Sequence, residues 1–63
     1  MSFKIKELRK HQNMTQRKLC EEAGISRPTL INLERGKEVN VTIATLNRIA
    51  SALKCKISDI FLS

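Results

Sequence analysis

The sequence predicts an all-α fold, a compact bundle of five helices that uses residues 1–63 as one domain. Apolar residues recur three or four positions apart in separate segments, and no segment alternates apolar and polar residues as a half-buried strand would. Ser or Thr stands before three of these segments, where a helix N-cap belongs. A chain of 63 residues can bury one hydrophobic core and has no material for a second.

The first helix is expected over about Phe3–Gln12, in a segment rich in Lys, Arg and Glu. Ile5 and Leu8, three residues apart, give this segment one apolar face. Asn13–Met14 should interrupt the helix, and Thr15 then begins the next one as its N-cap.

The second helix, about Gln16–Ala23, and the third, about Arg27–Arg35, form the most informative part of the chain. Cys20 provides a small side chain where the third helix crosses the second. Gly24, four residues later, can take the positive φ of a tight turn. Ser26 should then cap the third helix. Two short helices joined in this way, on a basic domain, are typical of a device that places one helix in a DNA groove.

The third helix is predicted to have an inner and an outer face. Pro28 falls in its first turn, where a missing N–H is no loss, and Gly36 ends it. The inner face carries Leu30, Leu33 and Glu34, and the outer face carries Pro28, Ile31, Asn32 and Arg35, with Arg27 at the N-terminal tip. A carboxylate on the inner face needs a partner, because a buried unpaired charge is costly.

The outer face suits the edges of DNA bases. Ile31 can contact a thymine methyl group, Asn32 can pair with adenine and Arg27 with guanine. An apolar side chain that points to solvent is also common on protein surfaces. The combination of the three side chains on one helix face favours DNA.

Two further helices are expected after a loop over residues 37–41. Thr42 should cap a fourth helix that continues to about Lys54. Its apolar stripe consists of Ile43, Leu46, Ile49, Ala50 and Leu53. A fifth helix of one or two turns, with Ile57, Ile60 and Phe61, should cover the core.

The chain is basic, with 12 Lys and Arg, six Asp and Glu and a net charge of +6. This excess favours a polyanionic partner. No apolar stretch approaches the roughly 20 residues of a membrane span, and no signal-peptide core is present. We therefore expect a cytoplasmic protein with no membrane segment.

Catalysis, metal binding and cofactors are not expected. The chain has one histidine, His11, no paired-carboxylate cleft and no glycine-rich phosphate loop. Cys20 and Cys55 lack the spacing of a zinc site and occupy predicted inward positions. They are expected to be buried reduced thiols.

Three stretches carry a family resemblance: IKELRK, MTQRKLCEEAGISRPTLINLERGK and ATLNRIASALKCKISDIF. Over about Ile5–Phe61 the chain resembles the Cro/repressor-type helix-turn-helix family of bacterial and phage transcriptional regulators. The resemblance implies a lambda-repressor-like fold of five helices, with the helix-turn-helix formed by the second and third. It also implies double-stranded operator DNA as the partner and a homodimer on a palindromic site.

The resemblance assigns site residues by position. Base edges would be contacted by Arg27, Pro28, Ile31 and Asn32. Phosphates would be contacted by Thr15, Gln16, Arg17, Arg35 and Lys37, with Gln16 at the positive N-terminus of the second helix. The resemblance also implies a structural ion pair between Arg9 and Glu34.

The chain departs from the family pattern at three positions. Lys54 stands where a glycine often follows the fourth helix, so this helix end is expected to cap differently. Val41 stands where proline is frequent. Pro28 can make only van der Waals contacts where relatives often form hydrogen bonds, so the operator sequence cannot be transferred from a relative.

The sequence thus predicts a repressor that acts as a homodimer by occupying its operator. The expected dimer surface is the fifth helix and the tail, with Phe61 and Leu62, together with part of the end of the fourth helix. Two alternatives stay open. One is an antitoxin or a restriction-modification control protein on the same fold, and the other is a protein-interaction module that has lost operator binding. A protein partner such as a toxin or an antirepressor is compatible with both.

Overall fold

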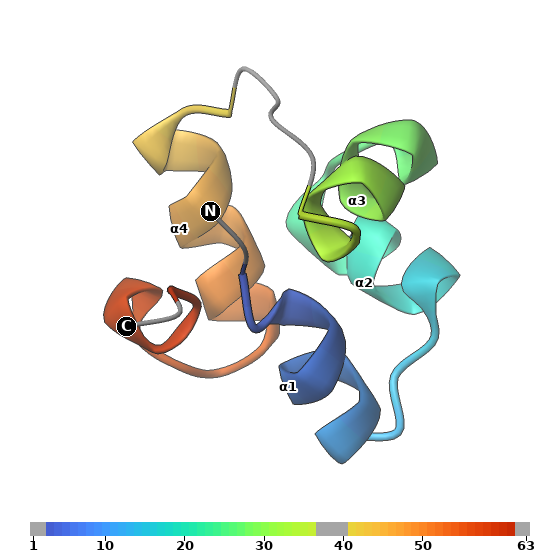
Figure 1. The fold of residues 1–63 in the computed structure, drawn as a ribbon. Coiled ribbons are helices and arrows are strands. Elements are labelled where there is room, and N and C mark those ends of the chain that lie inside the picture. Colours follow the sequence, from blue (N-terminus) through green and yellow to red (C-terminus); the bar gives the residue numbers. More distant parts are fainter. Residues whose placement is uncertain (1–2, 37–40, 62–63) are drawn as a thin grey trace.

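The computed structural model describes residues 3–36 and 41–61. The regular secondary structure of these residues is helical, apart from one isolated bridge between Phe3 and Phe61. Figure 1 shows the arrangement of α1 (Ile5–His11), α2 (Gln16–Ala23), α3 (Arg27–Glu34), α4 (Ile43–Ala52) and the short 3₁₀ helix η1 (Ile57–Asp59). The predicted all-α class is confirmed. A loop was predicted before α4 over residues 37–41, and residues 37–40 of it lie outside the described part of the chain.

Three helices begin at the residues that the sequence indicated, because a hydroxyl side chain satisfies a free N–H at each start. Thr15 Oγ1 accepts from the N–H of Lys18 at 3.0 Å. Ser26 Oγ accepts from the N–H of Thr29 at 3.4 Å and caps α3. Thr42 Oγ1 does the same for α4, at 3.1 Å. The three predicted N-caps are confirmed.

Gly24 makes the turn between α2 and α3 possible through its backbone conformation. Its φ is +69°, in the left-handed region that side chains disfavour. No atom lies within 4 Å of the position that a Cβ would take, so the glycine is needed for its φ and not for space. The N–H groups of Gly24 and Ile25 both donate to the carbonyl of Cys20, at 2.8 and 3.1 Å, and close the end of α2.

Lys54 provides the same backbone conformation after α4. The sequence predicted a helix to about Lys54, but α4 ends at Ala52 and Lys54 has a φ of +56°. The N–H of Cys55 donates to the carbonyl of Ala50 at 2.9 Å, and that of Lys54 donates to Ser51 at 3.1 Å. These two bonds form a Schellman motif. Lys54 therefore takes the left-handed conformation that a glycine usually takes at this position, and for a lysine that conformation is strained.

We expect Lys54→Gly to stabilise the protein, by about 1 kcal/mol, because a left-handed conformation costs a side-chain-bearing residue about 1–2 kcal/mol and a glycine little. Urea unfolding followed by circular dichroism measures the change. Lys56→Gly is the matched control, since Lys56 has an extended backbone with a φ of −83° and should lose stability. A destabilised Lys54→Gly protein would contradict the strain at this position.

The core is aliphatic, and α2 packs against both α3 and α4. The fully buried side chains of the core include Ile5, Leu19, Leu30, Leu33, Ile49, Leu53 and Ile60. Ile43, expected in the buried stripe of α4, is 62% exposed. It lies in the first turn at the edge of the stripe, while Leu46, Ile49, Ala50 and Leu53 face the core.

The expected fifth helix is only the 3₁₀ turn η1, so the described residues hold four α-helices. The reason is the path of the chain after the turn. The N–H of Lys4 donates to the carbonyl of Ile60, and Phe61 pairs with Phe3 as an isolated antiparallel bridge. The two phenyl rings lie 5.7 Å apart. This pairing requires extended backbone at Phe61 and stops helical continuation, while Ile60 still covers the core. For the same reason α1 begins at Ile5 and not at Phe3.

Candidate nucleic-acid interface

The two faces of α3 differ as the sequence predicted. Leu30 and Leu33 are fully buried, and the Glu34 side chain is 4% exposed. On the other face Arg27, Pro28 and Arg35 are exposed, and Ile31 and Asn32 are half-buried. The helix is therefore anchored on one side, and its other side presents cationic, polar and apolar side chains to solvent.

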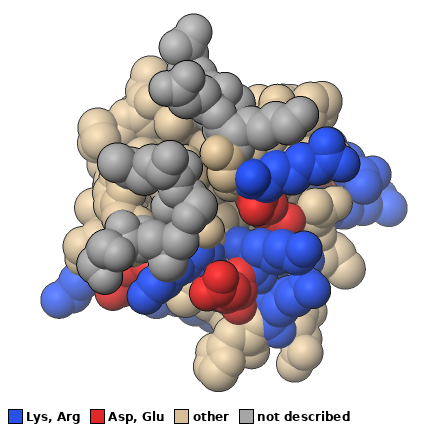
Figure 2. Space-filling model, in the orientation of Figure 1, with Lys and Arg blue, Asp and Glu red and all other residues tan. Residues whose placement is uncertain are grey.

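Exposed basic side chains accompany this accessible face. They include Lys6 of α1, Arg17 at the start of α2, and Arg27 and Arg35 at the two ends of α3. Figure 2 shows Lys and Arg side chains gathered on the part of the surface that α1 and α3 occupy in Figure 1. A positive potential on this side attracts a polyanion.

A hollow of about 240 Å³ lies among α1, the start of α2 and the end of α3. Its lining residues are Lys6, Gln16, Ile31, Glu34 and Arg35. Three of these, Gln16, Ile31 and Arg35, are among the residues that the sequence assigned to DNA contacts. Lys6 is not among them. The available signal was its spacing, since Lys6 lies three residues before Arg9 on one helix face and Arg9 was expected to reach Glu34 on α3.

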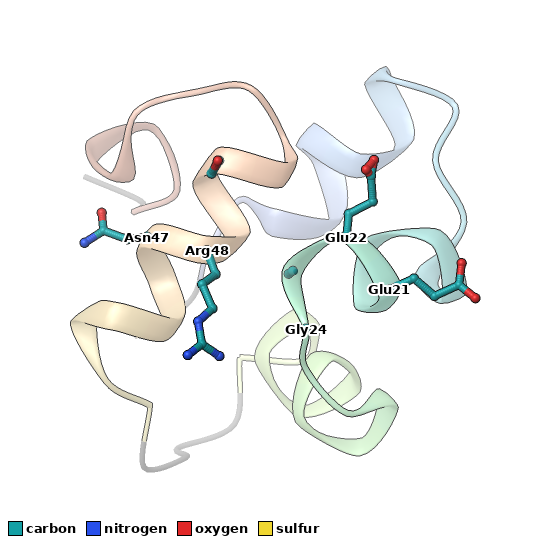
Figure 3. A pocket seen from close by; sticks show the side chains of 7 residues that line it. Glu21, Glu22, Gly24, Asn47 and Arg48 are labelled. Carbon is teal, nitrogen blue, oxygen red and sulfur yellow. The ribbon is translucent and has the colours of Figure 1, made fainter.

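A second hollow, of about 470 Å³, lies between the end of α2 and the middle of α4. Figure 3 shows Glu22 and Arg48 on its opposite sides, with Gly24 between the helices. Glu21 and Glu22 both line it, so two carboxylates accompany one guanidinium. This balance of charge does not suit a polyanion, and the smaller hollow beside α3 is the better candidate.

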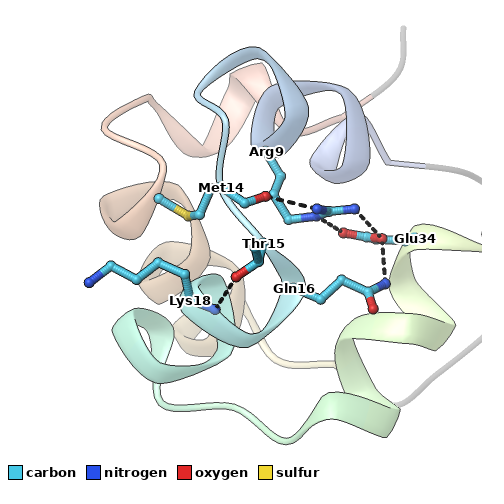
Figure 4. A network of polar contacts seen from close by, with 6 residues as sticks. All are labelled: Arg9, Met14, Thr15, Gln16, Lys18 and Glu34. Carbon is cyan, nitrogen blue, oxygen red and sulfur yellow. Dashed lines mark hydrogen bonds and ion pairs between the residues drawn. The ribbon is translucent and has the colours of Figure 1, made fainter.

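A polar network beside the smaller hollow ties three helices together (Figure 4). Arg9 Nε donates to Glu34 Oε2 at 2.7 Å and Nη2 donates to Oε1 at 3.2 Å, which makes the pair bidentate. Arg9 Nη1 also donates to the carbonyl of Met14 at 2.8 Å. Gln16 Nε2 donates to Glu34 Oε1 at 3.0 Å. The network joins α1, Met14 and the first residue of α2 to α3.

This network fixes the start of α2, where two phosphate contacts were predicted. Glu34 holds the Gln16 amide in one orientation and leaves the amide Oε1 and a second N–H for other partners. Thr15 Oγ1 accepts from Lys18, so the hydroxyl hydrogen of Thr15 can still donate. Both side chains are thus positioned by intramolecular bonds while a donor stays available.

The remaining predicted contacts differ in their surroundings. Arg17 Nε lies 3.5 Å from Glu21 Oε2 in an exposed pair one helical turn apart. Such an exposed pair contributes little to stability, so Arg17 can leave Glu21 and bind a phosphate at small cost. Lys37 lies outside the described residues.

The two cysteines are free thiols. Burial raises the pKa of the Cys20 thiol, an effect that Arg27 opposes and Glu34 supports. Burial also raises the pKa of Cys55, with a further contribution from Asp59. Cys55 is only half-buried, against the expectation of a buried position, but it still packs against the core. Both thiols stay protonated and weakly nucleophilic at neutral pH.

Residues 3–36 and 41–61 contain neither a cluster of metal ligands nor a membrane-spanning helix. No three His, Cys, Asp or Glu side chains of this part of the chain gather where they could hold a metal ion. No helix that the structure describes combines the length and the apolar character needed to cross a bilayer.

Comparison with known proteins gives a consistent result. The helix-turn-helix family matches residues 5–60. An uncharacterized HTH-type transcriptional regulator of Archaeoglobus fulgidus is 40% identical over 62 residues, which cover 98% of this chain and 86% of that protein.

Solved structures agree in fold. The restriction-modification controller protein C.AhdI from Aeromonas hydrophila superposes with a TM-score of 0.84 at 28% identity, over 92% of this chain and 86% of that chain. SinR, a master regulator for biofilm formation, matches in its complex with DNA with a TM-score of 0.80 at 27% identity, over 87% of both chains. The SinR/SinI protein complex matches with a TM-score of 0.79 at 28% identity, over 86% of this chain and 52% of that chain.

Proposed function

The chain belongs to the helix-turn-helix family of transcriptional regulators, which are not enzymes, and from this premise we propose that it binds double-stranded DNA in a sequence-specific manner. One observation carries the proposal. The accessible face of α3 carries two cationic side chains, one polar side chain and two apolar ones. Leu30, Leu33 and the paired Glu34 fix its other face to the protein. A rigid helix with such a face is what direct readout in the major groove needs.

We propose the division of contacts that the family resemblance implies, and the exposure of the side chains supports it. Arg27, Pro28, Ile31 and Asn32 of α3 meet base edges. Thr15, Gln16, Arg17 and Arg35 meet backbone phosphates, together with Lys37. Phosphate contacts supply most of the affinity and make binding fall steeply with salt, whereas base contacts select the sequence.

We further propose that two copies bind a palindromic operator and repress by blocking access to it. Two recognition helices must then lie about 34 Å apart, one turn of DNA. The turn η1 and the half-buried Phe61 form the candidate dimer surface. The tail residue Leu62, also assigned to this surface, lies outside the described residues. A protein whose partner is genomic or phage DNA works in the cytoplasm.

A second candidate function is control of a restriction-modification system, or an antitoxin role. The match to C.AhdI over 92% of this chain favours the first of these. The partner genes distinguish these roles, because all of them use the same interface.

A third candidate is a module that binds a protein in place of DNA. The match to the SinR/SinI complex shows that a relative of this fold binds another protein. A toxin or an antirepressor would be a partner of this kind for the present chain.

Selection from a randomised duplex pool at about 0.1 M salt tests the proposal, because salt weakens the sequence-independent phosphate contacts and leaves the base contacts to decide which duplexes are enriched. We expect an enriched palindrome whose half-sites are centred one helical turn apart. An enriched single half-site would contradict the proposed homodimer and support the proposed sequence-specific DNA binding. A pool that stays random would leave non-specific binding only and favour the protein-binding alternative.

A further inference from the structure

The hollow between α1 and α3 collects cationic and hydrogen-bonding groups from three helices. Lys6 comes from α1, Gln16 is the first residue of α2, and Arg35 is the C-cap residue of α3. Ile31 and Glu34 complete the wall. The hollow has a volume of about 240 Å³, which gives it room for a small anionic group rather than a base pair.

The carboxylate in the wall does not cancel this positive character. Glu34 is 4% exposed, and both of its oxygens accept hydrogen bonds from Arg9, one of them also from Gln16. Its charge is therefore neutralised by a bidentate arginine behind it. Lys6 and Arg35 are exposed and carry the net charge that an incoming ligand meets.

The start of α2 adds hydrogen-bond donors at the same place. The first N–H groups of a helix have no partner within it and carry a partial positive charge. In α2 the N–H of Lys18 donates to the Thr15 hydroxyl. The N–H of Leu19 makes the first helical bond, to the Thr15 carbonyl at 3.0 Å. The Gln16 amide is held beside these groups by its bond to Glu34.

We propose that this hollow binds one phosphate of the DNA backbone and that Lys6, on α1, is a direct ligand of it together with Arg35 and Gln16. The inference rests on the proposed DNA binding and extends it, since α1 becomes part of the interface. Arg9 lies three residues after Lys6 and fixes α1 to α3 through Glu34. The same ion pair thus sets the distance between Lys6 and Arg35.

The test compares Lys6→Gln with Arg48→Gln, which removes one charge from the exposed surface of α4, in the acidic hollow. Duplex affinity is measured for both variants and the wild type over a range of salt concentrations. One lost phosphate contact should reduce the slope of log K against log salt by about 0.9 and weaken all sequences alike. We expect this change for Lys6→Gln and an unchanged slope for Arg48→Gln. Equal changes would reflect net charge alone and overturn the proposal.

A modified duplex locates the contact. Replacing one phosphate at a time by an uncharged methylphosphonate should weaken wild-type binding at several positions. At one of them Lys6→Gln should lose no further affinity, because the contact is already absent. If the protein binds the duplex but no such position exists, Lys6 is not a phosphate ligand, and the proposed DNA binding is unaffected. If the wild-type protein binds no duplex at all, the proposed function itself is wrong.

Inorganic phosphate tests whether a free anion is the occupant of the hollow. The duplex makes many contacts and free phosphate only one, so a low phosphate concentration at constant ionic strength should leave the duplex affinity of the wild type almost unchanged. A large loss of duplex affinity under these conditions in the wild type, and not in Lys6→Gln, would assign the hollow to a free anion and overturn the DNA assignment.

Discussion

Arg9→Ala should lower the free energy of unfolding by about 3–5 kcal/mol, because it leaves a carboxylate without its partner in the protein interior. Glu34 is 4% exposed and Arg9 10%, and the two share a bidentate contact at 2.7 and 3.2 Å. Arg9 also bonds the Met14 carbonyl, so its loss frees a second acceptor. A chain of this size is expected to have only about 3–5 kcal/mol of stability, and the variant should be largely unfolded at 25 °C. Urea unfolding followed by circular dichroism measures the effect.

Two further variants make the result decisive. Arg17→Ala breaks the exposed pair with Glu21, whose side chains are 80% and 60% accessible, and should cost less than about 1 kcal/mol. The double variant Arg9→Met with Glu34→Leu removes both charges and should recover most of the stability that Arg9→Ala loses. If Arg9→Ala unfolds at the same urea concentration as the wild type, the pair has no structural role.

Local chemistry explains why much of the helix-turn-helix could be predicted from the sequence. The bounds of α2 depend on Thr15 and Gly24, and the start of α3 depends on Ser26. Each of these residues acts on backbone groups within three or four positions. A hydroxyl before a helix and a glycine after it therefore give the boundary without knowledge of the rest of the fold.

The features that the sequence did not give depend on contacts between distant residues. The fifth helix is a 3₁₀ turn because Phe61 pairs with Phe3 at the other end of the chain. Ile43 is exposed because the packing of α2 against α4 decides how wide the buried stripe is. Lys54 was identified as unusual only by its place in the family pattern, and its left-handed φ became visible in the structure.

The candidate site divides in the same way. The two faces of α3 follow from helical periodicity, so the outer residues could be chosen from the sequence. The position of Lys6 in the hollow depends on how α1 is placed against α3, so its spacing from Arg9 is informative only together with the pair that Arg9 forms with Glu34. The bond between Gln16 and Glu34 joins residues 18 positions apart and was not predicted either.

Arg27→Ala should weaken binding to the selected operator by about 1–3 kcal/mol, which corresponds to about a 5- to 150-fold rise in Kd. Arg27 is exposed at the first position of α3, where a side chain that enters the major groove can bond guanine with two donors. The preference for one base pair of each half-site should disappear with it. Fluorescence anisotropy with the operator and with duplexes changed at single base pairs measures both effects.

Arg35→Ala is the control that separates base contacts from phosphate contacts. Arg35 lines the hollow assigned to the backbone, so its loss should weaken the operator and every changed duplex by the same factor. Its salt dependence should also become shallower, whereas that of Arg27→Ala should change little if the guanidinium binds a base and no phosphate. Uniform losses in both variants would mean that α3 reads no sequence through Arg27, and specificity would then have to come from Pro28, Ile31 and Asn32.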